Sequence, residues 1–475
     1  MYDIIENFFC KISSVTKALL LDTTGGIERC LSGKVLINRI DCTANFLKDL
    51  GVNQNDRVVC VSDNSLETAI LVLTAMRHGI CICMQPAGTS KIELERVKEL
   101  IGARAIINTT QHKIDNTFSM YNNNCLSRTP LLPETVNPQT PFTITFTSGT
   151  TGKPKAIVHC AESFLNCADN FNKKAKISSD DKFLNIMPMF YMAGIFNGLI
   201  APLSIQASVI ISDAFNTSSA MRFWSMVEEK NISALWLSPT MLDLIIKLDR
   251  SNKKVSPSLK KVFVGTGAMA IETALSFEDI YNISPIQSYG LSELLYVSVD
   301  DGQEPNFGSV GYPLDGIKII SDGKNPLCID TPYSFLGYLV NGEIHPHSGP
   351  FQTSDLGLIS DKNILSILGR CDDIIVRGGV NINPIELENV VNGFLDGMNI
   401  CIVGKADSVL GEKVVLVSEK IYVDKEKFSI IRDALKQKFG RSQIDDKAMV
   451  DHFPVSSTGK IQRKELKFLI ESDIS

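Results

Sequence analysis

No stretch of this sequence is apolar over the roughly 18 residues that a membrane-spanning helix needs. The N-terminus carries Asp3 and Glu6 where a signal peptide would be basic. Basic charge is not in excess either, because 47 Lys and Arg residues stand against 53 Asp and Glu residues, a net charge of −6. Nucleic acid and anionic lipid both require a basic surface. We therefore expect a cytoplasmic protein with no membrane span and no nucleic-acid partner.

Pairs of the Cys-x-x-Cys kind are also missing, although the chain has 12 cysteines. The two closest, Cys81 and Cys83, would share one face of a strand, since side chains alternate along a strand. Free cysteines are commonly buried, and thiols in the cytosol stay reduced. We expect neither a disulfide nor a zinc site. The context "EIHPHSG" favours an exposed loop pair for His345 and His347 rather than a metal site.

The chain is longer than the size at which a single core stops growing, so its 475 residues predict at least two domains. Up to about residue 300, short β-rich runs alternate with helical periodicity, for example "DRVVCVSD" followed by "LETAILVLTAMRHG". This alternation predicts an α/β fold with a largely parallel sheet. Ligand sites in such folds lie at the carboxyl ends of the strands.

The character of the sequence changes twice toward the C-terminus. After about residue 300, short strands are separated by glycine and proline. After Arg370, the segment "CDDIIVRGGVNINPIELENVVNGF" begins a compact unit, and we place a domain boundary at Asp372. The predicted fold is a large N-terminal domain of parallel-rich sheets with flanking helices, residues 1–371, hinged to a small α+β C-terminal domain, residues 372–475.

A loop rich in glycine and hydroxyl groups, "TSGTTGKPK", forms a hairpin-like turn between the predicted strands "PFTITFT" and "KAIVH". Backbone amides, the Ser and Thr hydroxyls and Lys155 together offer many donors to phosphate oxygens. It is not a Walker A loop, because Gly149 and Gly152 are too close together and Pro154 follows Lys153. Composition alone leaves a solvated turn equally open, since Gly, Ser and Thr are ordinary turn residues.

The order of residues in this loop resembles the phosphate loop of the adenylate-forming superfamily. That superfamily contains acyl-CoA and aryl-CoA synthetases, the adenylation domains of peptide synthetases and firefly luciferase. Further motifs that resemble it follow in the right order: "YGLSE" at 289–293, "TSDLG" at 353–357, "GRCDDIIVRGG" at 369–379 and "PVSSTGKIQRKEL" at 454–466. Five motifs in sequence make a chance match implausible.

The resemblance implies an acid–thiol ligase that uses ATP and Mg²⁺. In this superfamily a carboxylate attacks the α-phosphate of ATP, which gives an acyl-adenylate and pyrophosphate, and a thiol then displaces AMP. Because an anion attacks an anion, charge neutralisation around the phosphates must supply much of the acceleration. Coenzyme A is the expected thiol, and a carrier protein that acts in trans is the alternative.

The resemblance assigns roles around the nucleotide by position in the motifs. The residues that would hold the ATP phosphates are Thr147, Ser148, Gly149, Thr150, Thr151, Gly152 and Lys155. Tyr289, next to Gly290, would stack on adenine. Ser292 would bond the α-phosphate, and Glu293 would bind Mg²⁺, which prefers oxygen ligands. For "YGLSE" taken alone, a turn with a solvated glutamate is the alternative.

Two further motif residues would contact the ribose. Asp355 would accept its hydroxyls, for which a carboxylate is well suited, and Arg370 would reach the ribose or a phosphate. The family usually has glycine where Ser354 stands, which leaves the backbone path open. A turn-capping aspartate is the alternative for Asp355.

The C-terminal motifs imply a moving domain. Asp372 matches the hinge about which that domain swings between the two half-reactions, a task that needs only a few residues. Gly379 matches a loop that lines the thiol tunnel, although Asn381 stands where a basic residue is common. Lys460 matches the catalytic lysine, whose compact charge would bridge the substrate carboxylate and the α-phosphate. A solvated acid and a solvated lysine are the alternatives for Asp372 and Lys460.

The acid itself is less well defined. The segments "PMFYMAGIF", "ALWLSPT" and "GTGAM" match the acyl pocket of the family, and its candidate lining is Phe190, Tyr191, Met192, Ala193, Phe196, Trp236, Gly267 and Met269. Core packing is the alternative for each of them. No aspartate lies near "FYMAG" to pair with an amine, so we expect a fatty or aryl acid. Tyr191 replaces a histidine that is frequent in the acyl-CoA synthetases.

Two other functions remain as alternatives. A non-catalytic nucleotide-binding relative would be consistent with Ser354 and Asn381, but a binding protein has no need of Lys460. A P-loop-type ATPase would release phosphate rather than pyrophosphate.

Overall fold

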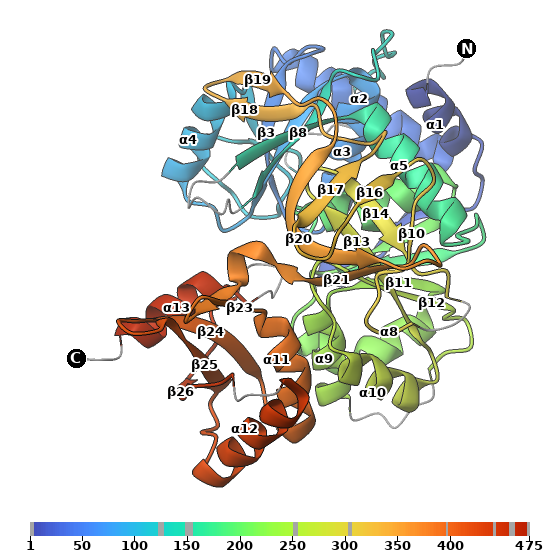
Figure 1. Cartoon of the computed structure of the whole chain (residues 1–475). Helices are drawn as coiled ribbons and strands as arrows, with labels where there is room; N and C mark the ends of the chain where they lie inside the picture. Colours follow the sequence, from blue (N-terminus) through green and yellow to red (C-terminus); the bar gives the residue numbers. More distant parts are fainter. Residues whose placement is uncertain are drawn as a thin grey trace.

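Two large mixed sheets organise the chain before Asp372 (Figure 1). The computed structural model describes residues 4–121, 128–147, 155–249, 255–302, 306–395, 398–439, 443–455 and 461–472. The eight-stranded sheet has the order β19-β18-β8-β7-β4-β3-β5-β6. Its strands are β3 (Arg57–Ser62), β4 (Cys81–Pro86), β5 (Ala105–Asn108), β6 (Phe118–Ser119), β7 (Pro141–Thr147), β8 (Lys155–Cys160), β18 (Gly337–Val340) and β19 (Glu343–Pro346).

The second sheet has nine strands in the order β15-β14-β13-β12-β11-β9-β10-β1-β2. They are β1 (Ala18–Asp22), β2 (Arg29–Ser32), β9 (Lys182–Asn185), β10 (Ser208–Ile211), β11 (Ala234–Leu237), β12 (Lys261–Val264), β13 (Pro285–Leu291), β14 (Leu295–Val299) and β15 (Tyr312–Pro313). A smaller sheet has the order β16-β17-β20-β21, formed by β16 (Lys318–Ile320), β17 (Pro326–Asp330), β20 (Phe351–Ile359) and β21 (Leu365–Arg370).

Helices connect and cover these sheets. They are α1 (Ile4–Ser13), η1 (Thr24–Gly26), α2 (Gly33–Asp49), α3 (Leu66–His78), α4 (Lys91–Ile101), α5 (Ala161–Lys174), the π-helix η3 (Ala193–Ile200), α6 (Ala201–Ser204), α7 (Thr217–Met221), α8 (Phe223–Glu229), α9 (Pro239–Leu248) and α10 (Ile271–Tyr281). Strand β3 pairs in parallel with both β4 and β5, as expected where helices connect consecutive strands.

The central strands of the eight-stranded sheet, β3, β4 and β5, are buried on both faces, which explains their continuous apolar sequences. In β3, Val58 and Cys60 face the core that includes α1, α2, α3 and α5, whereas Val59 and Val61 face the core under α4. Cys81 and Cys83 of β4 lie on the α4 side and are fully buried, so the prediction that they share one face is confirmed. Burial raises the pKa of each of these two thiols to about 12, which keeps them protonated.

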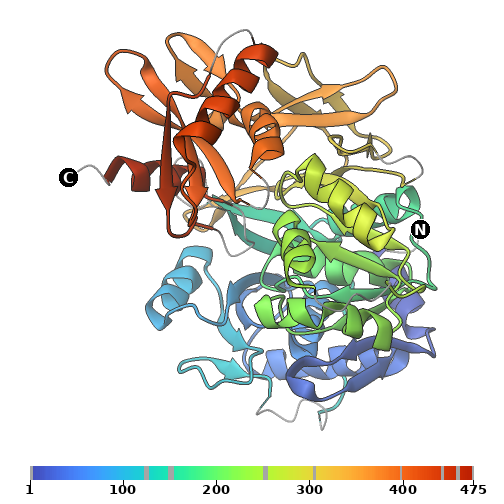
Figure 2. The same cartoon turned by 90° about the horizontal axis from the view of Figure 1, so that it is seen from below.

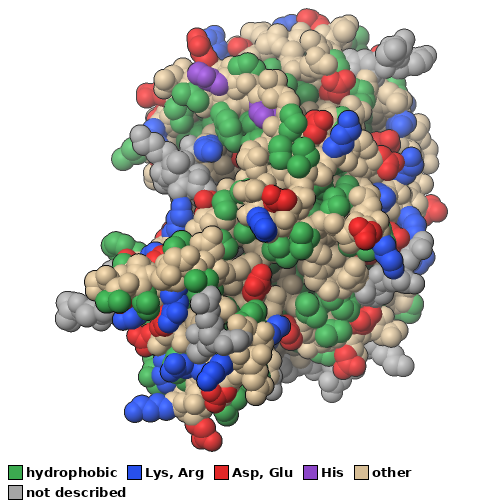
Figure 3. Space-filling view, in the orientation of Figure 1, with side chains coloured by type: hydrophobic (Ala, Val, Ile, Leu, Met, Phe, Trp, Pro, Cys, Tyr) green, Lys and Arg blue, Asp and Glu red, His purple; other side chains and the backbone are tan. Residues whose placement is uncertain are grey.

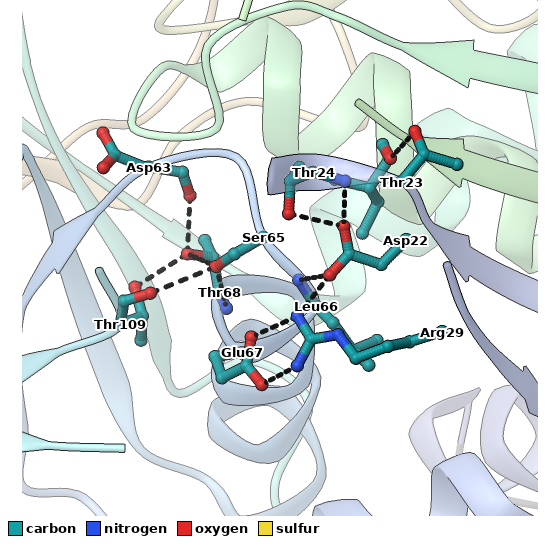
Figure 4. Close-up of polar contacts among 11 residues, drawn as sticks. Asp22, Thr23, Thr24, Arg29, Asp63, Ser65, Leu66, Glu67, Thr68 and Thr109 are labelled. Carbon is teal, nitrogen blue, oxygen red and sulfur yellow. Dashed lines mark hydrogen bonds and ion pairs between the residues drawn. The ribbon is translucent and has the colours of Figure 1, made fainter. Parts of the chain in front are cut away.

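A buried polar network joins the β1–β2 edge to the start of α3 (Figure 4). Asp22 and Arg29 are cross-strand partners and form an ion pair, and Arg29 also holds Glu67, with 2.8 Å between Nη2 and Oε2. The carboxylate of Asp22 is completely buried and accepts hydrogen bonds from the Thr24 amide at 2.9 Å, the Thr24 hydroxyl at 2.7 Å and the Leu66 amide at 3.3 Å. This network satisfies a charge that would otherwise be costly to bury.

The chain after Arg370 forms its own sheet with helices on both faces. Strands β22 (Ile375–Arg377), β23 (Val380–Ile382), β24 (Ile400–Asp407), β25 (Gly411–Glu419) and β26 (Asp446–Val450) build it, with β26 parallel to β25. The helical elements are η4 (Cys371–Asp373), α11 (Pro384–Val391), η5 (Asn392–Phe394), α12 (Lys425–Phe439) and α13 (Arg463–Ser472). Helices α11 and α12 pack on one face, and α13 packs on the other. This part lies together at one end of the molecule in both views (Figures 1 and 2).

The predicted fold class is confirmed: parallel-rich sheets with flanking helices precede a small α+β unit. The division into hinged domains at Asp372 stays a prediction. Among the described residues, no helix is both long and apolar enough to cross a bilayer. Acidic and basic side chains are interspersed on the face shown in Figure 3.

The prediction for the two neighbouring histidines is wrong in part. His345 is exposed, as expected, but it lies in β19 rather than in a loop. His347 is half-buried, because its ring stacks on Phe335 with 4.9 Å between the centroids. The sequence context did not reveal that β19 pairs with β18 and extends the sheet edge.

Candidate active site

The predicted hairpin at the phosphate-loop motif is confirmed at its two ends. Strands β7 and β8 are antiparallel neighbours, and Thr147 lies opposite Lys155 in their register. Ser148, Gly149, Thr150, Thr151 and Gly152 lie outside the described residues. The exposed ammonium of Lys155 lies 5.2 Å from the centroid of the Tyr338 ring, a cation–π distance.

Tyr338 connects this lysine to the "YGLSE" motif. Its hydroxyl donates a hydrogen bond to Oε1 of Glu293 at 3.1 Å. Burial, and then the Glu293 carboxylate, raise the pKa of Tyr338 well above its usual value, so the phenol stays a donor. Tyr338 lies on β18 opposite Ile157 of β8, which brings it beside the hairpin. No residue spacing in the sequence indicated this contact, so the sequence did not predict Tyr338 as a residue of the candidate site.

The "YGLSE" motif is the end of β13 and the turn that follows it. Gly290 is required there, because a Cβ at this position would lie 2.3 Å from the carbonyl oxygen of Leu295. Glu293 is half-buried in the turn, and its backbone carbonyl accepts a hydrogen bond from the Phe335 amide at 2.9 Å. The preceding carbonyl, that of Ser292, lies 2.7 Å from Nε2 of His159.

Tyr289, Asp355 and Arg370 come together from three strands. Asp355 of β20 and Arg370 of β21 are cross-strand partners, with 3.5 Å between Nε of Arg370 and Oδ1 of Asp355. The Tyr289 hydroxyl donates to Oδ2 of Asp355 at 2.6 Å. Burial, and then the Asp355 carboxylate, raise the pKa of Tyr289 well above its ordinary value. Nη2 of Arg370 also lies 3.6 Å from Asp372. The residues predicted for adenine and ribose therefore form one cluster.

The C-terminal candidates follow Arg370 in the chain. Asp372 is exposed in the short helix η4. Gly379 lies in the turn between β22 and β23 with φ +80°, a conformation that favours glycine, and it is exposed. Asn381 is exposed in β23. Lys460 lies outside the described residues.

The acyl-pocket candidates fall into two groups. Phe196 and Trp236 are almost fully buried and meet through Tyr296, whose ring centroid is 5.2 Å from that of Phe196 and 5.3 Å from that of Trp236. Tyr191 is half-buried just before η3, and Gly267 is exposed. Ala193 and Met269 belong to the same buried core as Phe196 and Trp236, and Phe190 and Met192 pack against it, so the pocket lining stays a prediction.

The sequence of residues 26–339 matches the AMP-binding enzyme family. The chain belongs to this family. The chain is 27% identical over 371 residues to the malonate–CoA ligase of Arabidopsis thaliana, in a match that covers 70% of this chain and 61% of that protein. It is 24% identical to a 2-succinylbenzoate–CoA ligase of Listeria monocytogenes, over 89% of this chain and 91% of that protein.

Solved structures share this fold. The ATP-bound MatB of Rhodopseudomonas palustris superposes with a TM-score of 0.86 over 99% of both chains at 18% identity. The predicted family and fold are therefore confirmed, and the curated relatives of this enzyme include acid–CoA ligases.

His159 makes the stability of this enzyme depend on pH. It is completely buried, and burial lowers its pKa from 6.5 to about 4. Below pH ~6.5 the unfolded chain binds a proton that the folded chain excludes, so stability falls as the pH drops from 6.5 to 4. We expect His159→Met to remove up to ~3 kcal/mol of this pH dependence. Urea unfolding of both proteins between pH 7.5 and 4.5 measures it, and a constant difference between them would contradict the prediction.

Proposed function

We propose that this protein activates a carboxylic acid with ATP and transfers the acyl group to a thiol, with coenzyme A as the preferred acceptor. Membership in the AMP-binding family supports the use of the nucleotide. The observation that carries the proposal is the convergence of Lys155 and Glu293 on Tyr338, beside the cluster of Tyr289, Asp355 and Arg370. This arrangement supports the proposal, because it brings together a cationic group suited to a polyphosphate and a carboxylate suited to ribose hydroxyls.

In the first half-reaction, a carboxylate oxygen of the acid attacks the α-phosphorus. The bond between that phosphorus and the bridging oxygen breaks, and pyrophosphate leaves. Lys155, together with hydroxyls and amides of the loop, would reduce the repulsion between the anions. Ser292 would hold the α-phosphate, and Asp355 would hold the ribose.

Mg²⁺ fits the donor set at Glu293. Oε1 of Glu293 accepts from Tyr338, and Oε2 has no hydrogen-bond partner among the described residues, so one carboxylate oxygen is available next to Tyr338, whose ring contacts Lys155. A hard dication prefers such oxygens and, when bound, would neutralise phosphate charge.

In the second half-reaction, the thiol sulfur attacks the acyl carbon, the bond from that carbon to the phosphate oxygen breaks, and AMP leaves. The thiol proton passes to solvent or to a base. We propose that the C-terminal unit turns about Asp372 between the two steps, so that Lys460 serves the first and the Gly379 loop serves the second.

The acid is proposed to be a fatty or aryl acid without an amine. Relatives are named for malonate, 2-succinylbenzoate and indoleacetate, which are acids without an α-amine, and the candidate pocket residues are mostly apolar or aromatic. An enzyme that loads a carrier protein in trans is the alternative, since a phosphopantetheine arm presents the same thiol.

The deciding experiment is exchange of labelled pyrophosphate into ATP with a panel of fatty, aryl, dicarboxylic and amino acids. We expect exchange only when an acid is supplied, and an aryl or fatty acid to be best. Exchange with amino acids alone would contradict the substrate class. Phosphate release without exchange would contradict the reaction and favour an ATPase. Coenzyme A and purified carrier proteins, offered separately, then identify the acceptor.

Glu293→Gln tests the proposed Mg²⁺ ligand. Gln keeps an oxygen that accepts from Tyr338, so folding should survive, whereas loss of the charge should slow exchange at least ~10-fold at limiting Mg²⁺. Glu272→Gln, at an exposed site on α10, is the control for a lost carboxylate and should leave exchange unchanged. An unaltered Mg²⁺ dependence in Glu293→Gln would show that Glu293 does not bind the metal.

A further inference from the structure

His159 is a buried imidazole whose only hydrogen bond among the described residues goes to the candidate active site. It lies on β8, four residues after Lys155, and is completely buried. Its Nε2 lies 2.7 Å from the carbonyl oxygen of Ser292. A carbonyl can only accept, so Nε2 carries the proton and donates. Nδ1 is then an acceptor, and it is buried without a hydrogen-bond partner in the described part of the chain.

At pH 7.5, well above the lowered pKa of His159, we expect this arrangement to contribute little net stability. One hydrogen bond is gained, but one buried nitrogen is left without a partner, and the two effects are of similar size and opposite sign. The ring also packs edge to face on Phe164, with centroids 5.6 Å apart, and lies 6.4 Å from Phe335. An apolar side chain of similar volume would fill this space without the unpaired nitrogen. The distinctive effect of the imidazole is therefore on the turn that it holds.

Three hydrogen-bond donors from neighbouring segments hold the turn between β13 and β14. His159 donates to the Ser292 carbonyl, the Phe335 amide donates to the Glu293 carbonyl at 2.9 Å, and the Tyr338 hydroxyl donates to the Glu293 carboxylate at 3.1 Å. His159 lies on β8, Phe335 lies just before β18, and Tyr338 lies on β18. Strand β18 and the residue before it pair with β8, where the Leu336 amide donates to the Val158 carbonyl at 2.8 Å. The strand that begins at the phosphate-loop hairpin thus also fixes the Ser292–Glu293 turn.

We propose that His159 is a positioning residue that fixes the Ser292–Glu293 peptide, so that the Ser292 hydroxyl and the Glu293 carboxylate keep their place relative to Lys155 on the same strand as His159. Without this donor, the Ser292 carbonyl would be left unpaired, and the peptide could rotate to find water. The proposal deepens the proposed function and rests on it for the roles of Ser292 and Glu293.

Three substitutions at one position separate positioning from packing. His159→Met fills the space without a donor. His159→Gln places its amide nitrogen near the position of Nε2, and His159→Asn places it only near Nδ1, so that Gln reaches the Ser292 carbonyl and Asn does not. Cys160→Ala, at the next residue of the strand, where the thiol contacts the Ser163 hydroxyl at 3.2 Å, is the control for a small loss of packing.

Each full-length variant is measured in three ways at pH 7.5: its melting temperature, its calorimetric Kd for ATP over a range of Mg²⁺ concentrations, and kcat and KM for pyrophosphate exchange. We expect Met and Asn to weaken ATP binding at limiting Mg²⁺ and to lower kcat, each by ~10-fold, with KM for the acid unchanged. The Gln variant should have a Kd for ATP and a kcat within ~3-fold of the wild-type values. The Met variant should melt within ~5 °C of the wild type.

Wild-type binding or kcat in the Met variant would overturn the proposal. Equal losses of ATP binding and kcat in the Gln and Asn variants would also overturn it. The same holds if neither the Met nor the Asn variant folds, because the role of His159 would then be packing. If the wild type shows no acid-dependent exchange, the proposed function fails, but the Mg²⁺-dependent ATP titration still decides the role of His159.

Discussion

Replacement of Lys460 by alanine is expected to slow acyl-adenylate formation at least ~100-fold, about 2.7 kcal/mol of barrier. This lysine is proposed to neutralise charge only while the C-terminal unit faces the nucleotide. Thioester formation from a preformed adenylate should be nearly unchanged, because the unit would by then have turned the Gly379 loop toward the site. The two half-reactions are measured separately, from ATP plus acid and from synthetic adenylate plus thiol.

Asp372→Pro is expected to slow the other half-reaction. Proline fixes φ and would restrict the hinge, so thioester formation should suffer more than adenylation. Asp372 is exposed, and its side chain makes an ion pair only with Arg370 among the described acidic and basic residues, so the native fold should tolerate the change. Equal losses in both half-reactions for Lys460→Ala would refute the two-conformation mechanism.

The second large effect concerns stability rather than turnover. Asp22→Leu should lower the free energy of unfolding by about 3–5 kcal/mol, because it leaves the charge of Arg29 half-compensated and removes the acceptor for the amides of Thr24 and Leu66. Urea unfolding followed by tryptophan fluorescence measures it. The only two tryptophans, Trp224 and Trp236, lie in the same core as β1, so the signal reports on this part of the chain.

An exposed pair supplies the control for Asp22. Glu93 and Arg96 form an ion pair on the surface of α4. We expect Glu93→Gln to lower the free energy of unfolding by less than ~1 kcal/mol. The double variant Asp22→Leu/Arg29→Leu should lose less free energy of unfolding than the sum of the two single variants, because removal of both partners leaves neither charge without the other. A loss of under ~1 kcal/mol for Asp22→Leu alone would show that the network does not stabilise the fold.

The sequence by itself determined the local elements and the family. Short continuous apolar runs predicted buried strands such as β3 and β4, because a strand that is covered on both faces is apolar at successive positions. The "PFTITFT" and "KAIVH" segments predicted a hairpin, because its strands are adjacent in the chain. Five motifs in order predicted the AMP-binding family, which the match over residues 26–339 confirms. These inferences all use residues that lie close together in sequence.

The tertiary structure alone decided how those motifs meet. Tyr338 and Glu293 are 45 residues apart, Tyr289 and Asp355 are 66 apart, and His159 and Ser292 are 133 apart. Each contact depends on which strands pair, in which register, and on how one sheet packs against another. Local propensity and spacing do not encode these choices, because a shift of one residue in register turns every side chain of a strand to the opposite face. Pairing of β8 with β18, almost two hundred residues later, is what places Tyr338 between Lys155 and Glu293.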